Sequence, residues 1–243
     1  MSRSYINAWR EILARTLGGF VVRHDESPRW LVNPDTGRRL KLDVLYPEIG
    51  VAVRFVGLQG SQTPRYLSLE EEEQQGVRDT ARAELCRAHG INLVPIDVTS
   101  GETRAILQEL RYALSDASRR LARSEQPLNR KGELVERLSR ARSQLETVAS
   151  QLSGPAGLGV YAQLWQDRTY ADKPAASKPA AGLAPLAFVP GMRVRHVAYG
   201  EGAIESIEDD GHDQLVNVRF ADGTRRTFAA SLVAGKLLAH TRF

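Results

Sequence analysis

Hydrophobic and polar positions follow two different rhythms in the first hundred residues. Trp9, Ile12, Leu13 and Leu17 recur at helical spacing near the start. The runs RWLVNP, RRLKLDVLYP and GVAVRFVG then predict strands, because turn residues separate them. A polar run, SLEEEEQQGVRDTARAELCRAHG, predicts a helix that ends at Gly90, and INLVPIDV predicts one more strand. We therefore expect residues 1–100 to form an α/β domain.

Residues 101–153 carry a helical rhythm alone. Apolar residues step by threes and fours at Leu107, Leu110, Leu114, Ala117 and Leu121, and again at Leu134, Leu138, Ala141, Leu145, Val148 and Leu152. The break at residues 127–132 predicts an antiparallel helical hairpin. Two arrangements fit this pattern equally well. The hairpin packs against the α/β domain, or it projects as a coiled coil, which could also pair two chains in a homodimer.

Residues 154–187 are expected to connect two folded parts. The second half of this segment, DKPAASKPAAGLAPLA, has the composition of a linker without a core. Tyr161, Leu164 and Trp165 in the first half predict a short helix, either docked on the first domain or serving as a partner motif; docking is the favoured interpretation.

Short alternating runs reappear after residue 188. MRVRHV, GAIESIE, QLVNVRF and RRTFAA predict four strands, and Asp222-Gly223 predicts a tight hairpin between the last two. Gly200 and Gly202 flank the expected bend from the first strand into the second. The positions expected to face inward are Val194, Ile204, Ile207, Val216, Val218 and Phe220. Residues 188–243 are thus expected to form a small all-β barrel that moves independently.

Composition indicates the cellular location of the protein and excludes some classes of site, but it does not indicate a function. Lysine and arginine number 33 against 29 acidic residues, which permits a polyanionic partner without requiring one. The single cysteine, Cys86, excludes an intrachain disulfide and a cysteine-based zinc site. The N-terminal sequence has neither a signal-peptide pattern nor an apolar span, so a cytoplasmic protein without a membrane partner is expected. The phosphate-binding G-x-x-x-x-G-K-S/T motif of a helicase motor is absent from the sequence.

The C-terminal pattern resembles a known docking module. PGMRVRHVAYGEGAIESIE and VNVRFADGTRRTFAASLV resemble the SH3/Tudor-like C-terminal domain of UvrD/PcrA-type DNA helicases and, more distantly, the RNA-polymerase-interaction domains of CarD and Mfd. The matching positions are Gly191, Val194, His196, Tyr199, Gly200, Gly202 and Ile204. The resemblance implies a module that binds RNA polymerase. His196 is interpreted as structural, and the arginines expected to alternate outward as a docking face are Arg193, Arg195, Arg219, Arg225 and Arg226.

The N-terminal pattern resembles the PD-(D/E)XK nuclease fold, especially its restriction-endonuclease-like and very-short-patch-repair-like members. KLDVLYPEIGVAVRFVG places Asp43 on the first metal-binding carboxylate, Arg54 where a second acid belongs and Val56 where a lysine or glutamine belongs. The resemblance therefore implies a degenerate site without catalytic residues or cofactor, in which Arg54 forms a bidentate pair with Asp43.

A magnesium-dependent endonuclease recruited by the barrel is the alternative. It requires Asp43 to bind the metal ion with a replacement second carboxylate, and a replacement for the missing lysine. The candidates for the carboxylate are Glu48 and the acidic run Glu70 to Glu73, and those for the lysine are Lys41 and Gln59.

Basic residues in two places are candidates for contacts with DNA. Arg78 and Arg82 lie with Asp79 on the helix that, by the nuclease resemblance, supports the site. Around the expected hairpin tip the candidates are Arg119, Arg120, Arg123, Arg130 and Lys131. Solvated surface charges and i, i+4 ion pairs are the competing interpretation of both groups.

These patterns together predict an adaptor in bacterial DNA transactions or transcription. A degenerate nuclease-like domain would bind DNA or protein, and the barrel would dock on RNA polymerase. The alternatives are the magnesium-dependent endonuclease and an assembly protein that dimerises through its hairpin.

Overall fold

The computed structural model describes residues 2–57, 69–125, 127–152, 157–171, 188–196, 198–209, 211, 213–233 and 236–239. They divide into two compact units, one of residues 16–145 and one of residues 3–15 and 146–243. Helices α1 (Ser2–Leu17) and α4 (Leu128–Leu152) contribute to both. No helix within the described ranges is long and apolar enough to cross a membrane.

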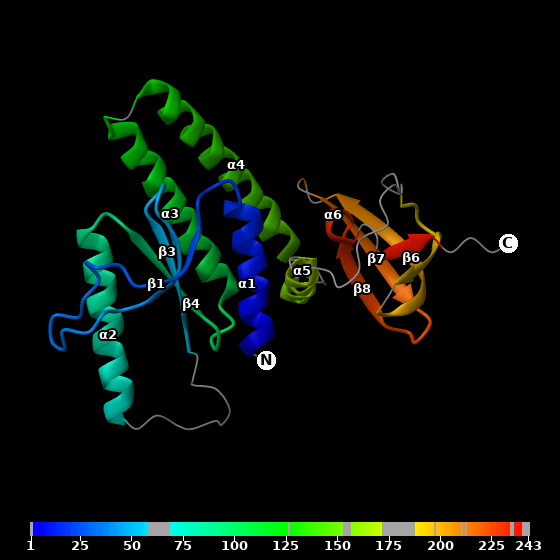
Figure 1. The fold of residues 1–243 in the computed structure, drawn as a ribbon, viewed down its shortest axis with the longest axis horizontal. Coiled ribbons are helices and arrows are strands. Elements are labelled where there is room, and N and C mark those ends of the chain that lie inside the picture. Colours follow the sequence, from blue (N-terminus) through cyan, green and yellow to red (C-terminus); the bar gives the residue numbers. More distant parts are fainter. Residues whose placement is uncertain are drawn as a thin grey trace. The chain divides into compact units, whose positions relative to one another are not determined.

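The first unit is built on a mixed four-stranded sheet in the order β1-β2-β3-β4 (Figure 1). Its strands are β1 (Arg23–Glu26), β2 (Leu42–Tyr46), β3 (Val51–Val56) and β4 (Asn92–Asp97). The first three are antiparallel, and β4 runs parallel to β3 after helix α2 (Leu69–Ala88). Helix α2 ends before Gly90, whose φ of 68° is readily adopted by glycine. The predicted α/β architecture is present.

The sheet differs from the prediction in two places. RWLVNP contributes only an isolated bridge between Val32 and Arg39, because the Asn33 side chain accepts a hydrogen bond from the Asp35 N–H and turns the chain. Strand β1 has the sequence RHDE, mostly exposed, and carries no hydrophobic alternation that could have predicted it.

The predicted helical hairpin consists of α3 (Thr103–Arg123) and the N-terminal part of α4 (Figure 1). All five predicted apolar positions of α3 are buried, as are Leu134, Leu138, Ala141, Leu145 and Val148 of α4. Helix α3 packs on β4 and β3, so the hairpin closes the α/β unit rather than projecting from it. A homodimer built on these apolar stripes would require the hairpin to open.

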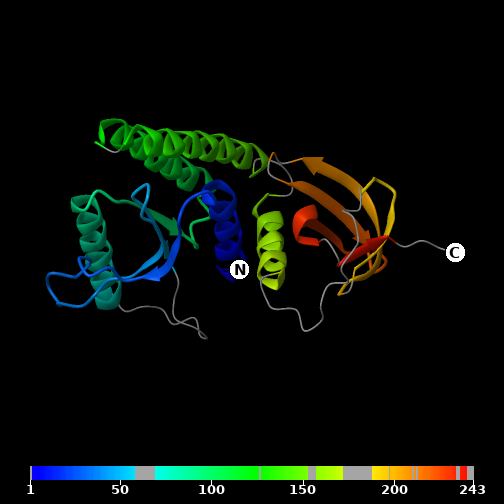
Figure 2. The same ribbon diagram turned by 45° about the horizontal axis from the view of Figure 1, so that its top comes forward.

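The second unit holds a strongly curved antiparallel sheet in the order β8-β7-β6-β5-β9, which forms a half-barrel (Figure 2). Its elements are β5 (Arg193–His196), β6 (Gly200–Asp209), β7 (Gln214–Phe220), β8 (Arg225–Ala229), the short helix α6 (Ala230–Val233) and β9 (Leu237–Ala239). Five of the six predicted inward positions are buried, and Ile207 packs partly buried against them. The short strand β9 was not predicted, because three residues are too few to show an alternation.

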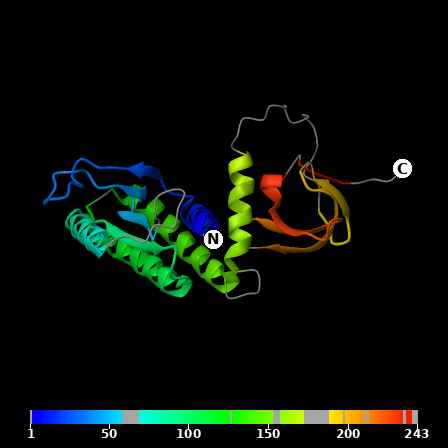
Figure 3. The ribbon, with the colours of Figure 1, turned by 90° about the horizontal axis from the view of Figure 1, so that it is seen from below.

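Helix α5 (Gly157–Ala171) belongs to the same unit and packs on β8 and α6 (Figure 3). It is the helix predicted around Tyr161, Leu164 and Trp165, and Tyr161 and Leu164 are buried. The predicted linker of residues 154–187 therefore contains a helix that belongs to the same unit as the barrel. Residues 172–187, predicted to be a linker, lie outside the described residues.

Candidate functional site

Asp43 and Arg54 face each other on neighbouring strands of the α/β unit. Val44 of β2 pairs with Val53 of β3, and in this antiparallel register the next positions along are Asp43 and Arg54. One guanidinium nitrogen of Arg54 lies 2.9 and 2.8 Å from the two carboxylate oxygens of Asp43. The backbone N–H of Phe55 donates a third hydrogen bond, at 2.8 Å, to Oδ2.

The predicted pairing of Asp43 with Arg54 is therefore present, with one difference in geometry. A single nitrogen bridges both oxygens, instead of two nitrogens forming parallel bonds. Because Arg54 supplies a positive charge where a second acid would be needed, this donor set does not fit a magnesium ion.

The residues considered as replacements are held elsewhere. Glu48 pairs with Arg137 at 3.0 Å and accepts the Val21 N–H at 2.8 Å. Burial acts to raise the pKa of Glu48, but these two contacts outweigh it and leave the pKa below its usual value. Lys41 pairs with Asp25 at 2.6 Å, and Gln59 lies outside the described residues.

Within the described residues, the acidic run at the start of α2 places no second carboxylate beside Asp43. The side chains of residues 70 and 72 lie outside the described residues, and those of Glu71 and Glu73 are exposed. Among the described residues, no cluster of three or more His, Cys, Asp or Glu side chains could hold a metal ion.

The two DNA-contact candidates on α2 differ in accessibility. Arg78 is exposed, but the Arg82 side chain is 7% exposed and forms an ion pair with Asp79. A buried guanidinium cannot reach a phosphate backbone outside the domain. Arg82 is therefore corrected to a structural residue, and Arg78 stays a candidate.

The hairpin-tip candidates also separate into two groups. Arg120 donates to the carbonyl oxygens of Ile49 and Gly50 at 3.1 and 3.2 Å, and Lys131 donates to the Ala122 carbonyl at 2.7 Å. Both side chains therefore stabilise the fold through hydrogen bonds to backbone carbonyl groups. Arg119, Arg123 and Arg130 are exposed, and Arg119 forms an ion pair with Asp116 at 3.5 Å.

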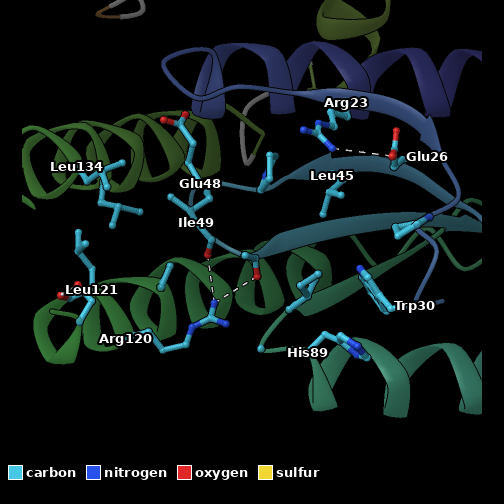
Figure 4. A pocket seen from close by; sticks show the side chains of 18 residues that line it. Arg23, Glu26, Trp30, Leu45, Glu48, Ile49, His89, Arg120, Leu121 and Leu134 are labelled. Carbon is cyan, nitrogen blue, oxygen red and sulfur yellow. Dashed lines mark hydrogen bonds and ion pairs between the residues drawn. The ribbon is translucent and has the colours of Figure 1, made fainter. Parts of the chain in front are cut away.

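A cavity of about 440 Å³ lies between the sheet, the end of α2 and the hairpin (Figure 4). Leu45, Leu121 and Leu134 line it together with Arg120. Trp30 and His89 stack at its edge with ring centroids 4.2 Å apart. It was not predicted, since its walls come from segments far apart in the sequence.

The outer face of the half-barrel carries an aligned row of arginines. Strand pairing places Arg193 of β5 beside Ala203, Ala203 beside Arg219 of β7, and Arg219 beside Arg225 of β8. Glu205 forms ion pairs with both Arg219 and Arg225. A hollow of about 230 Å³ lies where Arg193 and Arg219 flank the small residues of β6.

Arg193 and Arg195 are exposed, as predicted, and we call Arg193, Arg195, Arg219 and Arg225 the arginine face. Arg226 does not belong to it, because successive strand residues point to opposite faces. Its guanidinium carbon lies 4.1 Å from the centroid of the Tyr199 ring, and it also reaches Gln166 of α5 at 3.4 Å. Arg226 is corrected from an exposed docking residue to a half-buried one.

His196 is a core residue of the barrel, as interpreted from the sequence. It is 7% exposed, stacks on both Tyr199 and Phe228, and accepts the Ala198 N–H at Nδ1 with a distance of 3.1 Å. Burial, followed by the positive charges of Arg226 and Lys236, lowers the pKa of His196 to about 4. The imidazole is therefore neutral near pH 7.

Comparisons with known protein families, curated proteins and solved structures found no match to this chain.

Proposed function

We propose that this chain is a non-catalytic adaptor that docks on RNA polymerase through its C-terminal half-barrel and carries a nuclease-like domain that binds DNA or protein. The observation that carries the non-catalytic part is the Arg54 guanidinium on both carboxylate oxygens of Asp43. An ion pair in that position takes up the anionic oxygens that a PD-(D/E)XK nuclease would offer to magnesium.

The proposed docking surface is supported by its charge and exposure. The arginine face spans four neighbouring strands, and two glutamates of β6 lie among its four arginines: Glu205, which pairs with Arg219 and Arg225, and Glu201, which lies opposite Arg195. Arginine forms bidentate hydrogen bonds with carboxylates, so this surface suits an acidic region of a protein partner. The likeness of the half-barrel to UvrD/PcrA-type Tudor-like domains is the reason for proposing RNA polymerase as that partner.

Surface plasmon resonance with immobilised core RNA polymerase and the full chain tests the docking proposal. We expect saturable binding with a dissociation constant in the micromolar range or below. No binding at concentrations of tens of micromolar would remove the central claim.

An assay of strand cleavage with magnesium or manganese tests the non-catalytic part. We expect no cleavage that depends on Asp43. Cleavage by the wild type that disappears in Asp43→Ala would replace the adaptor with the magnesium-dependent endonuclease.

A further inference from the structure

Strand β8 forms one edge of the curved sheet, with β7 as its only neighbour among the described strands. The Phe220 N–H donates to the Thr224 carbonyl at 2.9 Å, so the next hydrogen-bonded pairs toward the end of β8 are Val218 with Arg226 and Val216 with Phe228. Thr227 lies between them opposite Asn217, in a pair without main-chain hydrogen bonds. Its N–H and carbonyl therefore point away from β7, as those of a strand edge do.

Helix α5 occupies this edge. The Thr227 N–H donates to Oε1 of Gln163 at 3.2 Å, and one helical turn further Gln166 accepts from Arg226 at 3.4 Å. A glutamine side chain thus takes the place that the carbonyl of an added strand would occupy.

The contact of α5 with β8 leaves buried polar groups unsatisfied. Asp167 Oδ2 and Arg226 Nε are both buried and have no hydrogen-bond partner among the described residues. Burial raises the pKa of Asp167 to about 6, against the attraction of Arg226 and Lys236, and the nearby Glu11 adds to the increase. Ionised Asp167 therefore opposes docking near pH 7.

Charged side chains connect α5 to α1. Arg168 donates to the two carboxylate oxygens of Glu11 at 2.8 and 2.9 Å, and Glu11 is fully buried. Arg10 lies over the Trp165 ring, 6.0 Å from its centroid. Arg168 and Glu11 form bonds in which both partners are charged, whereas Gln163 and Gln166 accept longer bonds, at 3.2 and 3.4 Å, from the Thr227 N–H and the Arg226 guanidinium. Separation of α5 from β8 would leave the pair of Arg168 with Glu11 in place.

We propose that α5 is a releasable internal cover on the outward edge of β8, which the chain must lift before a protein partner can use that edge. The identity of the partner rests on the proposed function, but the cover itself does not.

Amide hydrogen exchange in the full chain, measured by NMR, tests the cover at single residues. The Thr227 amide reports on α5, whereas the Phe228 amide points toward β7 and reports on the sheet. Gln163→Ala should abolish most of the protection of Thr227 and leave that of Phe228 unchanged, and Thr169→Ala on the exposed side of α5 should change neither. Unchanged protection of Thr227 in Gln163→Ala would overturn the proposal.

The same amide tests the role of Asp167. Because its pKa is higher when α5 is docked, raising the pH from 5 to 7.5 should weaken docking about 10-fold, after correction for intrinsic exchange. Asp167→Asn should remove this dependence and protect Thr227 more strongly at pH 7.5. A pH dependence that survives in Asp167→Asn would contradict this role.

The affinity for core RNA polymerase shows whether the proposal for α5 and the proposed function stand or fail separately. We expect Gln163→Ala to bind more tightly than the wild type, and Asp167→Asn to bind more weakly at pH 7.5. Equal affinities for the three proteins, with the exchange results as expected, would overturn the competition between α5 and the partner. If none of them binds while exchange behaves as expected, the proposed function fails and the cover stands.

Discussion

At the scale of single residues, Arg54 supplies the countercharge of Asp43 in the α/β unit. It is the partner of Asp43, and both side chains are largely buried, with 27% and 14% of their surfaces exposed. Removing one member of such a pair leaves the other desolvated and without its countercharge.

We therefore predict that Arg54→Ala lowers the free energy of unfolding by about 2 kcal/mol, measured by urea denaturation. Arg78→Ala, which removes an exposed arginine of the same unit, should change it by less than about 0.5 kcal/mol. The double variant Asp43→Ala, Arg54→Ala should be less destabilised than the sum of the two single variants. Additive effects would contradict a direct interaction between the two side chains.

His196 gives the half-barrel a specific response to acid. Its pKa is about 4 in the folded chain, below the usual value near 6.5, so the unfolded state takes up the proton first. The stability that neutral His196 contributes is complete above pH 6.5 and is lost as the pH falls toward 4. Between pH 6.5 and pH 5 this loss is about 2 kcal/mol.

His196→Gln should remove this pH-dependent loss. The measurement is the difference in unfolding free energy between variant and wild type at several pH values, since Asp167, with its raised pKa, titrates in the opposite sense over part of the same range. A difference that is constant between pH 5 and pH 7 would show that His196 is not the group responsible.

At the scale of elements, side-chain contacts fix how strands and helices meet. Only glycine fits at position 202 of β6, because a Cβ there would lie 2.8 Å from the Arg219 carbonyl oxygen and 2.9 Å from Val218 Cγ1. Gly200 is needed for a different reason, its φ of 76°, and a Cβ there would meet open space.

Gly202→Ala should therefore destabilise the half-barrel by about 3 kcal/mol through overpacking, and Gly200→Ala by about 1 kcal/mol through backbone strain. Thermal unfolding followed by circular dichroism measures both. A smaller effect for Gly202→Ala than for Gly200→Ala would contradict the close approach of β6 to β7.

Arg120 joins α3 to the turn between β2 and β3. We predict that Arg120→Ala costs about 2 kcal/mol of stability, because the part-buried Ile49 carbonyl loses its charged donor and the Gly50 carbonyl is left with the Asn92 N–H. Arg123→Ala on the same helix should stay within about 0.5 kcal/mol. Urea denaturation of the two variants makes the comparison. Equal effects of the two substitutions would show that Arg120 contributes no more to stability than an exposed arginine does.

The elements with a strong period were predictable from the sequence, and those defined by partners were not. The apolar stripes of α3 and α4 and the alternation in β5, β6 and β7 specify which face is buried before any tertiary contact is known. Strand β1 lacks such a signal, since RHDE becomes a strand only by pairing with β2.

The candidate site was predictable to a similar extent. The pairing of Asp43 with Arg54 follows from the positions of two charged residues on neighbouring strands. The roles of Arg82, Arg120 and Arg226 could not be predicted, because an arginine in a sequence gives no indication whether its neighbours in space are water, carbonyl groups or an aromatic ring. The contact of Gln163 with Thr227 depends on the docking of a helix on a strand edge, which carries no local pattern.

At the scale of the whole molecule, the chain combines a unit in which Arg54 pairs with Asp43 and a unit with an arginine face and a strand edge that α5 covers. Exposed Arg123 and Arg130 remain candidates for contact with a polyanion, and they provide a matched charge control for the arginine face.

The most direct test of this account is the affinity of the full chain for core RNA polymerase, measured for two charge reversals of equal size. The account predicts that Arg193→Glu with Arg195→Glu lowers the affinity at least 10-fold, while Arg123→Glu with Arg130→Glu leaves it within a factor of about 2. Equal affinities for both double variants, or no binding by any form of the chain, would contradict docking through the half-barrel.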